Sequence, residues 1–120
     1  MNVLSLLEDP LIDIGWEIID GRLRKPTFER KATVCVYLVP EGYPASPKRG
    51  RDVSIMASGD SELYFASVHE EDGVIKTTGS RAIALLAKGD TVEEAGETVY
   101  GDIPNIRGVL FYRTDIGKLI

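Results

Sequence analysis

Thr33-Val34-Cys35-Val36-Tyr37-Leu38-Val39 is the stretch that decides the fold, because apolar residues occupy it without polar alternation. Such a run, rich in β-branched side chains, predicts a β-strand. Because successive strand residues point to opposite faces, we expect protein to cover both faces of this strand. A second run, Arg81 to Ala87, predicts a further apolar strand.

A helix is expected before the first strand. Asp9-Pro10 predicts its start, with Asp9 as the cap and Pro10 at the first helical position. Apolar residues follow at helical spacing, with Trp16 alongside: Leu11, Ile14, Ile18 and Ile19. We interpret them as a packing face. No partner precedes this helix in the sequence, so we also expect the face to be exposed in isolation, marking a contact with something else.

Short strands and turns are expected in the second half of the chain. Asp72-Gly73 predicts a hairpin turn between strands over 62–68 and 74–78, because Asp-Gly tolerates positive φ angles. Thr91-Val92-Glu93-Glu94 fits a capping box and predicts a late helix that ends near Pro104. With short strands over 53–56 and 108–112, we predict an α+β domain of mostly antiparallel strands.

The composition limits the class of protein. The chain has 120 residues, 43% of them hydrophobic and 28% charged, as expected for one globular domain. Its apolar runs are far shorter than the roughly 20 residues of a membrane span, and no secretory signal is visible. A single cysteine fits a reducing compartment, so we expect the cytoplasm and no membrane partner. The net charge of −5 argues against nucleic-acid binding.

Positive charge is concentrated in one part of this acidic chain. Residues 22–51 hold eight of the 14 Lys and Arg residues but only two acids, Glu29 and Glu41. This window is +6, so the other 90 residues must together be −11. A local excess of positive charge favours anions. We therefore take the window as the first candidate for a binding site.

The loop at the end of the window, Gly42 to Arg51, offers chemistry for a phosphate. Lys48, Arg49 and Arg51 can form charge-assisted hydrogen bonds, and Tyr43 can stack on a bound group. A solvated surface loop is an equally good interpretation of the composition. Arg81 has two interpretations as well: it points into a cleft, or its charged end reaches solvent at the strand end.

Other reactive side chains have weaker cases. His69 stands beside three acids and could act as a general base, but a solvated turn histidine is the simpler interpretation. Cys35 lies in an apolar strand, where a small buried core residue is expected rather than a nucleophile. No second His or Cys stands at zinc-ligand spacing. We therefore predict neither a catalytic residue nor a metal ligand in this chain.

Several motifs, in order, resemble the C-terminal domain of phosphoribosylamine–glycine ligases (glycinamide ribonucleotide synthetases), which belong to the ATP-grasp superfamily. The resemblance covers nearly the whole chain and departs from the family pattern at Glu41, Phe65-Ala66-Ser67 and Ser80. The matching segments are Met1 to Leu11, Gly42-Tyr43-Pro44 with Lys48-x-Gly50, Asp72 to Arg81, Gly89 to Ala95, and Phe111-Tyr112-Arg113-Thr114-Asp115-Ile116-Gly117.

The resemblance implies a fold and a role. Residues 32–120 are expected to be the C-terminal ligase domain, a half-barrel resembling a rudimentary hybrid motif. Residues 1–31, an N-terminal helix and connector, are expected to be the tail of the ATP-grasp body. The enzymes of this family join glycine to 5-phosphoribosylamine in purine (IMP) biosynthesis, using ATP and Mg²⁺. The parts that bind ATP and metal are absent from this sequence, so we expect no cofactor in this chain and no ligase activity without the body, in cis or as a separate chain.

The resemblance and the charge pattern indicate the same substrate wall. Its expected residues, facing the 5′-phosphate of phosphoribosylamine, are Tyr43, Pro44, Lys48, Arg49, Arg51 and Arg81. The alternative is a free-standing, non-catalytic binding or regulatory module of the same fold, whose basic window contacts an anionic partner. A small enzyme centred on His69 is a third, less supported possibility.

Overall fold

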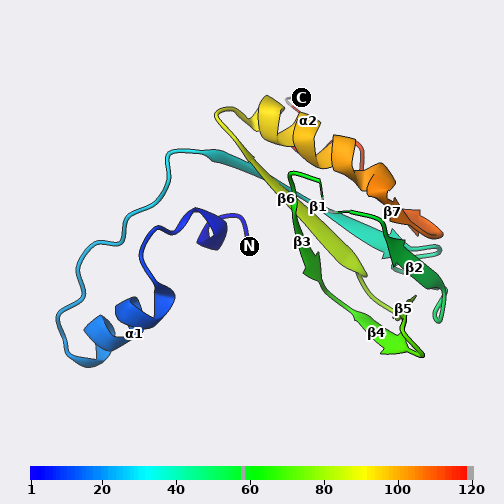
Figure 1. The fold of residues 1–120 in the computed structure, drawn as a ribbon, viewed down its shortest axis with the longest axis horizontal. Coiled ribbons are helices and arrows are strands. Elements are labelled where there is room, and N and C mark those ends of the chain that lie inside the picture. The colour runs from blue at the N-terminus through cyan, green and yellow to red at the C-terminus, as the bar shows by residue number, and fades with distance from the viewer. Residues whose placement is uncertain (58, 119–120) are drawn as a thin grey trace.

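The structure is a computed structural model that describes residues 1–57 and 59–118. Figure 1 shows its elements. In chain order the elements of these ranges are η1 (Leu4–Leu6), α1 (Leu11–Ile19), β1 (Ala32–Pro40), β2 (Asp52–Ile55), β3 (Glu62–Phe65), β4 (Val68–Glu71), β5 (Val74–Thr77), β6 (Ile83–Gly89), α2 (Val92–Asp102), η2 (Ile103–Asn105), β7 (Ile106–Arg107) and β8 (Leu110–Phe111).

The strands form two four-stranded sheets. The first has the order β3-β6-β1-β8 and the second the order β4-β5-β2-β7. Each of the strand pairings is antiparallel, and the longest runs from Ala32 opposite Gly89 to Leu38 opposite Ile83. Helix α2 lies across one face of the first sheet (Figure 1). The predicted α+β class is thus confirmed, with its strands divided between two sheets.

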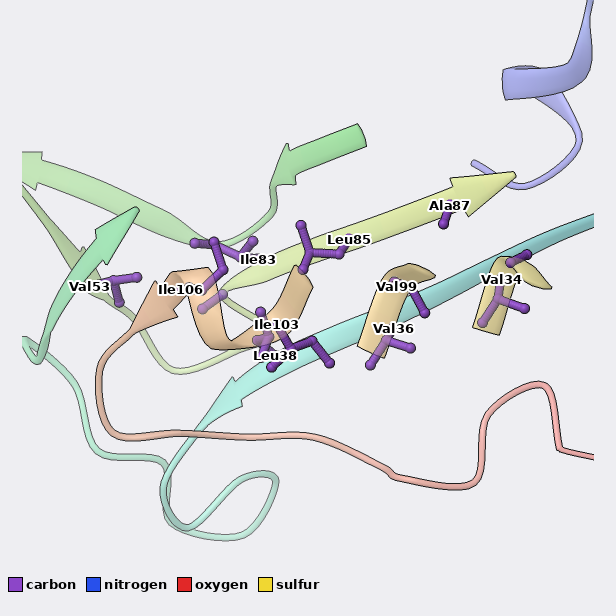
Figure 2. Close-up of a cluster of buried hydrophobic side chains, with 12 residues drawn as sticks. Val34, Val36, Leu38, Val53, Ile83, Leu85, Ala87, Val99, Ile103 and Ile106 are labelled. Carbon is purple, nitrogen blue, oxygen red and sulfur yellow. The ribbon is translucent and has the colours of Figure 1, made fainter. Parts of the chain in front are cut away.

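The core lies between the first sheet and α2. Every second residue of β1 points into it, and Figure 2 shows these side chains facing those of the helix. Leu38 is 2% exposed and Val99 of α2 is fully buried. Burial of each such side chain stabilises the fold by about 1.5–3 kcal/mol. The core side chains shared by β1, β6, α2 and η2 are Val34, Val36, Leu38, Ile83, Leu85, Ala87, Val99 and Ile103.

The opposite face of β1 is only half-buried. Cys35, Tyr37 and Val39 all alternate with the core residues and retain partial exposure. The prediction that protein covers both faces of this strand is therefore wrong, and so is the placement of Cys35 in the core. The physical reason is that α2 covers one face of the sheet, whereas the other opens onto a cavity.

The β4–β5 hairpin has the predicted turn. Asp72 and Gly73 adopt φ angles of 52° and 78°, the positive values that this sequence favours. The single strand expected over 62–68 is instead two strands, β3 and β4, in different sheets. The chain changes sheet at Ala66-Ser67, where the amides of these two residues donate to the carbonyls of Ala82 (2.9 Å) and Arg81 (2.8 Å).

The late helix begins as predicted. The Thr91 hydroxyl accepts a hydrogen bond from the Glu94 amide at 3.1 Å, and the Glu94 carboxylate accepts one from the Asp90 amide at 2.7 Å. This reciprocal arrangement satisfies amide groups that a helix start otherwise leaves unpaired. Pro104 lies in η2, directly after the end of α2.

The N-terminal segment projects away from the two sheets (Figure 1). Its helix α1 begins after Pro10 without a side-chain cap, so the prediction that Asp9 caps it is wrong. The Asp9 carboxylate instead accepts hydrogen bonds from the Thr27 amide (2.6 Å) and hydroxyl (2.8 Å) and pairs with Arg24 at 2.9 Å. These bonds, led by the Thr27 amide, hold the pKa of Asp9 below its usual value. These contacts join the start of α1 to the connector that follows the helix.

Helix α1 has no buried residue. Trp16 is 59% exposed and Ile19 is 72% exposed, which confirms the expected unpartnered apolar face. Among the described residues, no helix is long and apolar enough to cross a membrane.

Candidate functional site

A cavity of about 450 Å³ lies on the open face of β1. The loop after β1, the corner before β6, strand β8 and the following tail complete its wall. Most of the lining is apolar or aromatic, with two arginines. The lining residues are Cys35, Val36, Tyr37, Val39, Tyr43, Arg81, Phe111, Tyr112, Arg113 and Ile116.

Arg81 is the available cation of this cavity. Its guanidinium carbon lies 4.6 Å from the centroid of the Tyr37 ring, within the range of a cation–π interaction. The backbone is fixed on both sides, because the Arg81 carbonyl accepts from Ser67 and the Ala82 amide donates to Leu38 at 2.9 Å. Among the residues that the structure describes, no carboxylate pairs with Arg81. Its charge thus remains available to an anion.

Arg113 differs from Arg81 because it has an internal counterion. Its Nε donates to the Asp115 carboxylate at 2.9 Å, and a second bond joins the same two side chains. The pair raises the pKa of Arg113 and lowers the pKa of Asp115. Arg113 therefore adds less net charge to the cavity than Arg81 does.

Tyr100 of α2 holds the tail that carries Arg113. Its hydroxyl donates to the Arg113 carbonyl at 2.9 Å and accepts from the Ile116 amide at 3.0 Å. The Tyr100 ring also lies 6.3 Å from the ring of Tyr112, a cavity residue. Helix α2 thus holds the tail that forms part of the cavity wall, although Tyr100 itself is not a lining residue of this cavity.

The loop after β1 turns back sharply at Gly42. This residue has a φ angle of 81°, and its carbonyl accepts a hydrogen bond from the Ser46 amide at 2.8 Å. A Cβ at position 42 would lie 2.1 Å from the Ser46 carbonyl oxygen, so the turn requires glycine. The turn brings Tyr43 to the cavity. Pro44 follows through a cis peptide bond and is not a lining residue.

The basic end of the loop is anchored by Thr77 of β5, a residue that is only 1% exposed. The Thr77 hydroxyl donates to the Lys48 carbonyl at 3.0 Å and accepts from the Arg51 amide at 3.1 Å. The Thr77 carbonyl accepts from the Gly50 amide at 2.8 Å. The backbone of the loop is thereby fixed to the second sheet, while the side chains of Lys48 and Arg51 are exposed.

Arg49 lies against the corner that leads to Arg81. Its guanidinium is so close to Gly79 that a Cβ there would lie 2.7 Å from the Arg49 Nη2. Of the predicted site residues, Tyr43 and Arg81 therefore line one cavity and Arg49 adjoins its corner. Lys48 and Arg51 flank Arg49 in the loop, and none of the four basic residues has an ion-pair partner in the described part of the chain.

The +6 window does not form one patch. Three of its cations lie in the N-terminal connector and pair with acids outside the window. The pairs are Arg22 with Asp20, Arg24 with Asp9 and Glu17, and Lys31 with Asp90. The connector also runs away from the loop after β1 (Figure 1). The loop is therefore the part of the window that contributes to the candidate site.

The aromatic part of the site was missed by sequence reasoning. Tyr37 occurs within an apolar run, and its partial exposure follows only from the absence of cover on that face of β1. Phe111, Tyr112 and Arg113 belong to the closing motif that resembles the family, and nothing in their sequence pattern indicated that they line a cavity. The signal available for Tyr37 was a hydroxylated aromatic residue on the strand face opposite Val36 and Leu38.

The remaining candidates lie elsewhere. His69 is an exposed residue of β4, opposite Lys76 in the second sheet. Within residues 1–57 and 59–118, no group of three or more His, Cys, Asp or Glu side chains is placed to hold a metal ion. A second cavity, of about 460 Å³, lies between α2 and the tail, with Glu93, Glu97 and Lys118 in its wall.

The fold and the cavity define an α+β domain with an arginine-containing and aromatic recess. The chain belongs to the family described as "Phosphoribosylglycinamide synthetase, C domain", whose model matches residues 33–119. This confirms the resemblance seen in the sequence.

Relatives are similar over nearly the whole chain. It is 42% identical over 119 residues to a phosphoribosylamine–glycine ligase of Methanosarcina barkeri, covering 98% of this chain and 28% of that protein. A Pyrococcus abyssi ligase of the same name is 42% identical over 121 residues, with 98% and 27% covered. The crystal structure of the Thermotoga maritima ligase matches 95% of this chain and 29% of its own, with a TM-score of 0.82 and 27% identity. The chain thus spans little more than a quarter of the length of these relatives.

Proposed function

We propose that this chain forms one wall of the substrate cleft of a phosphoribosylamine–glycine ligase. This ligase joins glycine to 5-phosphoribosylamine with ATP hydrolysis in purine biosynthesis. The family supports the assignment to this enzyme. The observation that supports a role in binding is Arg81, which lines an aromatic cavity and has no ion-pair partner among the described residues.

The wall binds the substrate through its phosphate. Arg81 projects from a fixed backbone, and Arg49 lies at the adjoining Gly79 corner. Guanidinium groups bind phosphate oxygens through paired, charge-assisted hydrogen bonds. Lys48 and Arg51 add positive potential from the same loop, while Tyr43 and Pro44 shape its approach to the cavity. Catalysis by this wall would consist of orientation and charge neutralisation rather than proton transfer.

ATP and Mg²⁺ are assigned to the ATP-grasp body, in cis or as a separate chain. Residues 32–120 form the C-terminal ligase domain, and residues 1–31 belong structurally to that body. Two observations support this division: the family model matches from residue 33, and α1, whose apolar residues are exposed, lies in a segment that projects away from the sheets. We expect the chain to be inactive as a ligase on its own and to work in the cytoplasm.

The test is a ligase reconstituted from this chain and the ATP-grasp body. Arg81→Ala and Arg49→Ala should each raise the apparent KM for phosphoribosylamine about tenfold or more, because a charge-assisted hydrogen bond is worth about 1.5–3 kcal/mol. The matched control is Arg107→Ala, which removes the same charge from β7 of the second sheet. An unchanged KM in Arg81→Ala would overturn the assignment of the wall. Activity of the chain without the body would overturn its role as one part of the enzyme.

A further inference from the structure

The ring of Tyr37 lies beneath the guanidinium of Arg81. The ring lies on the open face of β1, half-buried, and the Arg81 guanidinium carbon lies 4.6 Å from its centroid. Ala84 stands opposite Tyr37 in the β1–β6 pair and opposite Tyr64 in the β3–β6 pair, so the two rings flank a small residue. Tyr64 is in turn fixed by a hydrogen bond from its hydroxyl to Glu62. The Tyr37 ring therefore stands on a regular part of the sheet, not on a loop.

An arginine side chain in solvent samples many rotamers, and fixing it in one of them costs conformational entropy. No carboxylate among the described residues fixes Arg81, although one fixes Arg113 of the same cavity. The Tyr37 ring is thus the group that can orient the guanidinium of Arg81, as the Asp115 carboxylate orients that of Arg113. Because a ring orients the guanidinium without neutralising it, the positive charge remains available to a bound anion.

We infer that Tyr37 is a positioning residue for the phosphate group of the substrate, acting through Arg81. This inference rests on the proposed function. It assigns to the ring of Tyr37, rather than to its hydroxyl, the orientation of the arginine before the substrate binds. Preorganisation of this kind raises affinity by reducing the ordering cost of binding.

The experiment compares Tyr37→Leu with Tyr37→Phe, which keeps the ring. In the 120-residue chain, the NMR resonance of the Arg81 Nε–H group reports the ring directly, because a stacked ring shifts it. We expect this ring-current shift in the wild type and in Tyr37→Phe, and its loss in Tyr37→Leu.

The kinetic readout is the apparent KM of the reconstituted ligase for phosphoribosylamine. The stacked contact contributes about 0.5–1 kcal/mol, so this KM should rise roughly two- to fivefold in Tyr37→Leu and not in Tyr37→Phe, with kcat unchanged.

A double variant distinguishes this inference from the proposed function. In an Arg81→Ala background, Tyr37→Leu should have no further effect on KM, because the two side chains act as one unit. A wild-type Arg81 resonance without a ring-current shift would overturn the stacking whatever the enzyme does. If Arg81→Ala raises KM but Tyr37→Leu does not, the inference is wrong and the proposed function stands. If Arg81→Ala leaves KM unchanged, the proposed wall fails first and the inference fails with it.

Discussion

The two faces of β1 contain similar residues but have different uses. Val34, Val36 and Leu38 pack against α2 and are almost fully buried, whereas Cys35, Tyr37 and Val39 remain half-exposed beside an open cavity. Hydrophobicity alone does not separate the two sets. The difference lies in what each face contacts: one packs against a helix of the same chain, and the other lines a cavity together with Arg81 and further aromatic side chains. We therefore expect the helix-side face to determine stability and the cavity-side face to determine binding.

The largest effect should come from the helix-side face. Leu38→Ala removes a fully buried side chain and should lower the free energy of unfolding by about 2–5 kcal/mol. Val39→Ala, one residue along on the other face, should cost no more than about 1 kcal/mol. Urea denaturation of the two variants makes the comparison. Equal losses would show that the faces do not differ in the proposed way.

A smaller loss of stability is expected where Tyr100 of α2 bonds the tail that lines the cavity. Tyr100→Phe removes the hydroxyl that binds the Arg113 carbonyl and the Ile116 amide and should cost about 1 kcal/mol. Hydrogen exchange at the Ile116 amide should accelerate, because its acceptor is gone. Tyr112→Phe is the matched control, since no hydrogen bond of its hydroxyl occurs among the described residues. Unchanged exchange in Tyr100→Phe would contradict the role of the hydroxyl.

A change at Gly79 should separate binding from stability. Gly79→Ala places a methyl group 2.7 Å from the Arg49 Nη2, and the flexible end of Arg49 can move away. We expect a stability change within about 0.5 kcal/mol and a higher KM for phosphoribosylamine in the reconstituted ligase. With Arg49→Ala already present, Gly79→Ala should have no further effect on KM. A further rise in that background would mean that Gly79 acts by some route other than Arg49.

The smallest effect concerns the thiol of the cavity-side face. Partial burial raises the pKa of Cys35, because desolvation disfavours the thiolate. The thiolate fraction at neutral pH is therefore lower than in an unfolded chain, and alkylation by iodoacetamide should be slower in the native protein. Its rate should keep rising with pH above the usual thiol pKa of about 8.5. A rate that reaches its plateau below that pH would contradict the shift, and the protein unfolded in urea provides the reference rate.

The sign of the matching stability effect follows from the same shift. The native state holds the Cys35 proton more tightly than the unfolded state does. The corresponding stabilisation is present below the unfolded pKa and is lost as the pH rises through the native pKa. Comparison of Cys35→Ala with the wild type over this alkaline range should reveal a small pH-dependent difference.

Local chemistry made parts of the fold predictable. The Asp72-Gly73 turn and the Thr91 cap depend on residues that are adjacent in sequence, and both are present. The split of residues 62–71 into strands of two sheets was not predictable in this way, because Ala66 and Ser67 bind Ala82 and Arg81, distant along the chain. The prediction that protein covers both faces of β1 was wrong for a related reason. An apolar run shows that a face can pack against a partner, but not whether the fold places a partner there.

The candidate site was only partly visible in the sequence. The basic residues of the loop and Arg81 stood out by charge, and the structure places Arg49 and Arg81 near one corner. The pairing of Arg22, Arg24 and Lys31 with acids outside the window could not be read from composition. Tyr37 could not be recognised as part of the cavity wall, because its meeting with Arg81 depends on the register of β1 and β6.

Ile116 belongs to the walls of both cavities, the one beside β1 and the one beside α2. The tail that contains it therefore acts as a partition with a hollow on each side. The Tyr100 hydroxyl bonds this tail at both Arg113 and Ile116, so one side chain of α2 contributes to the walls of both cavities.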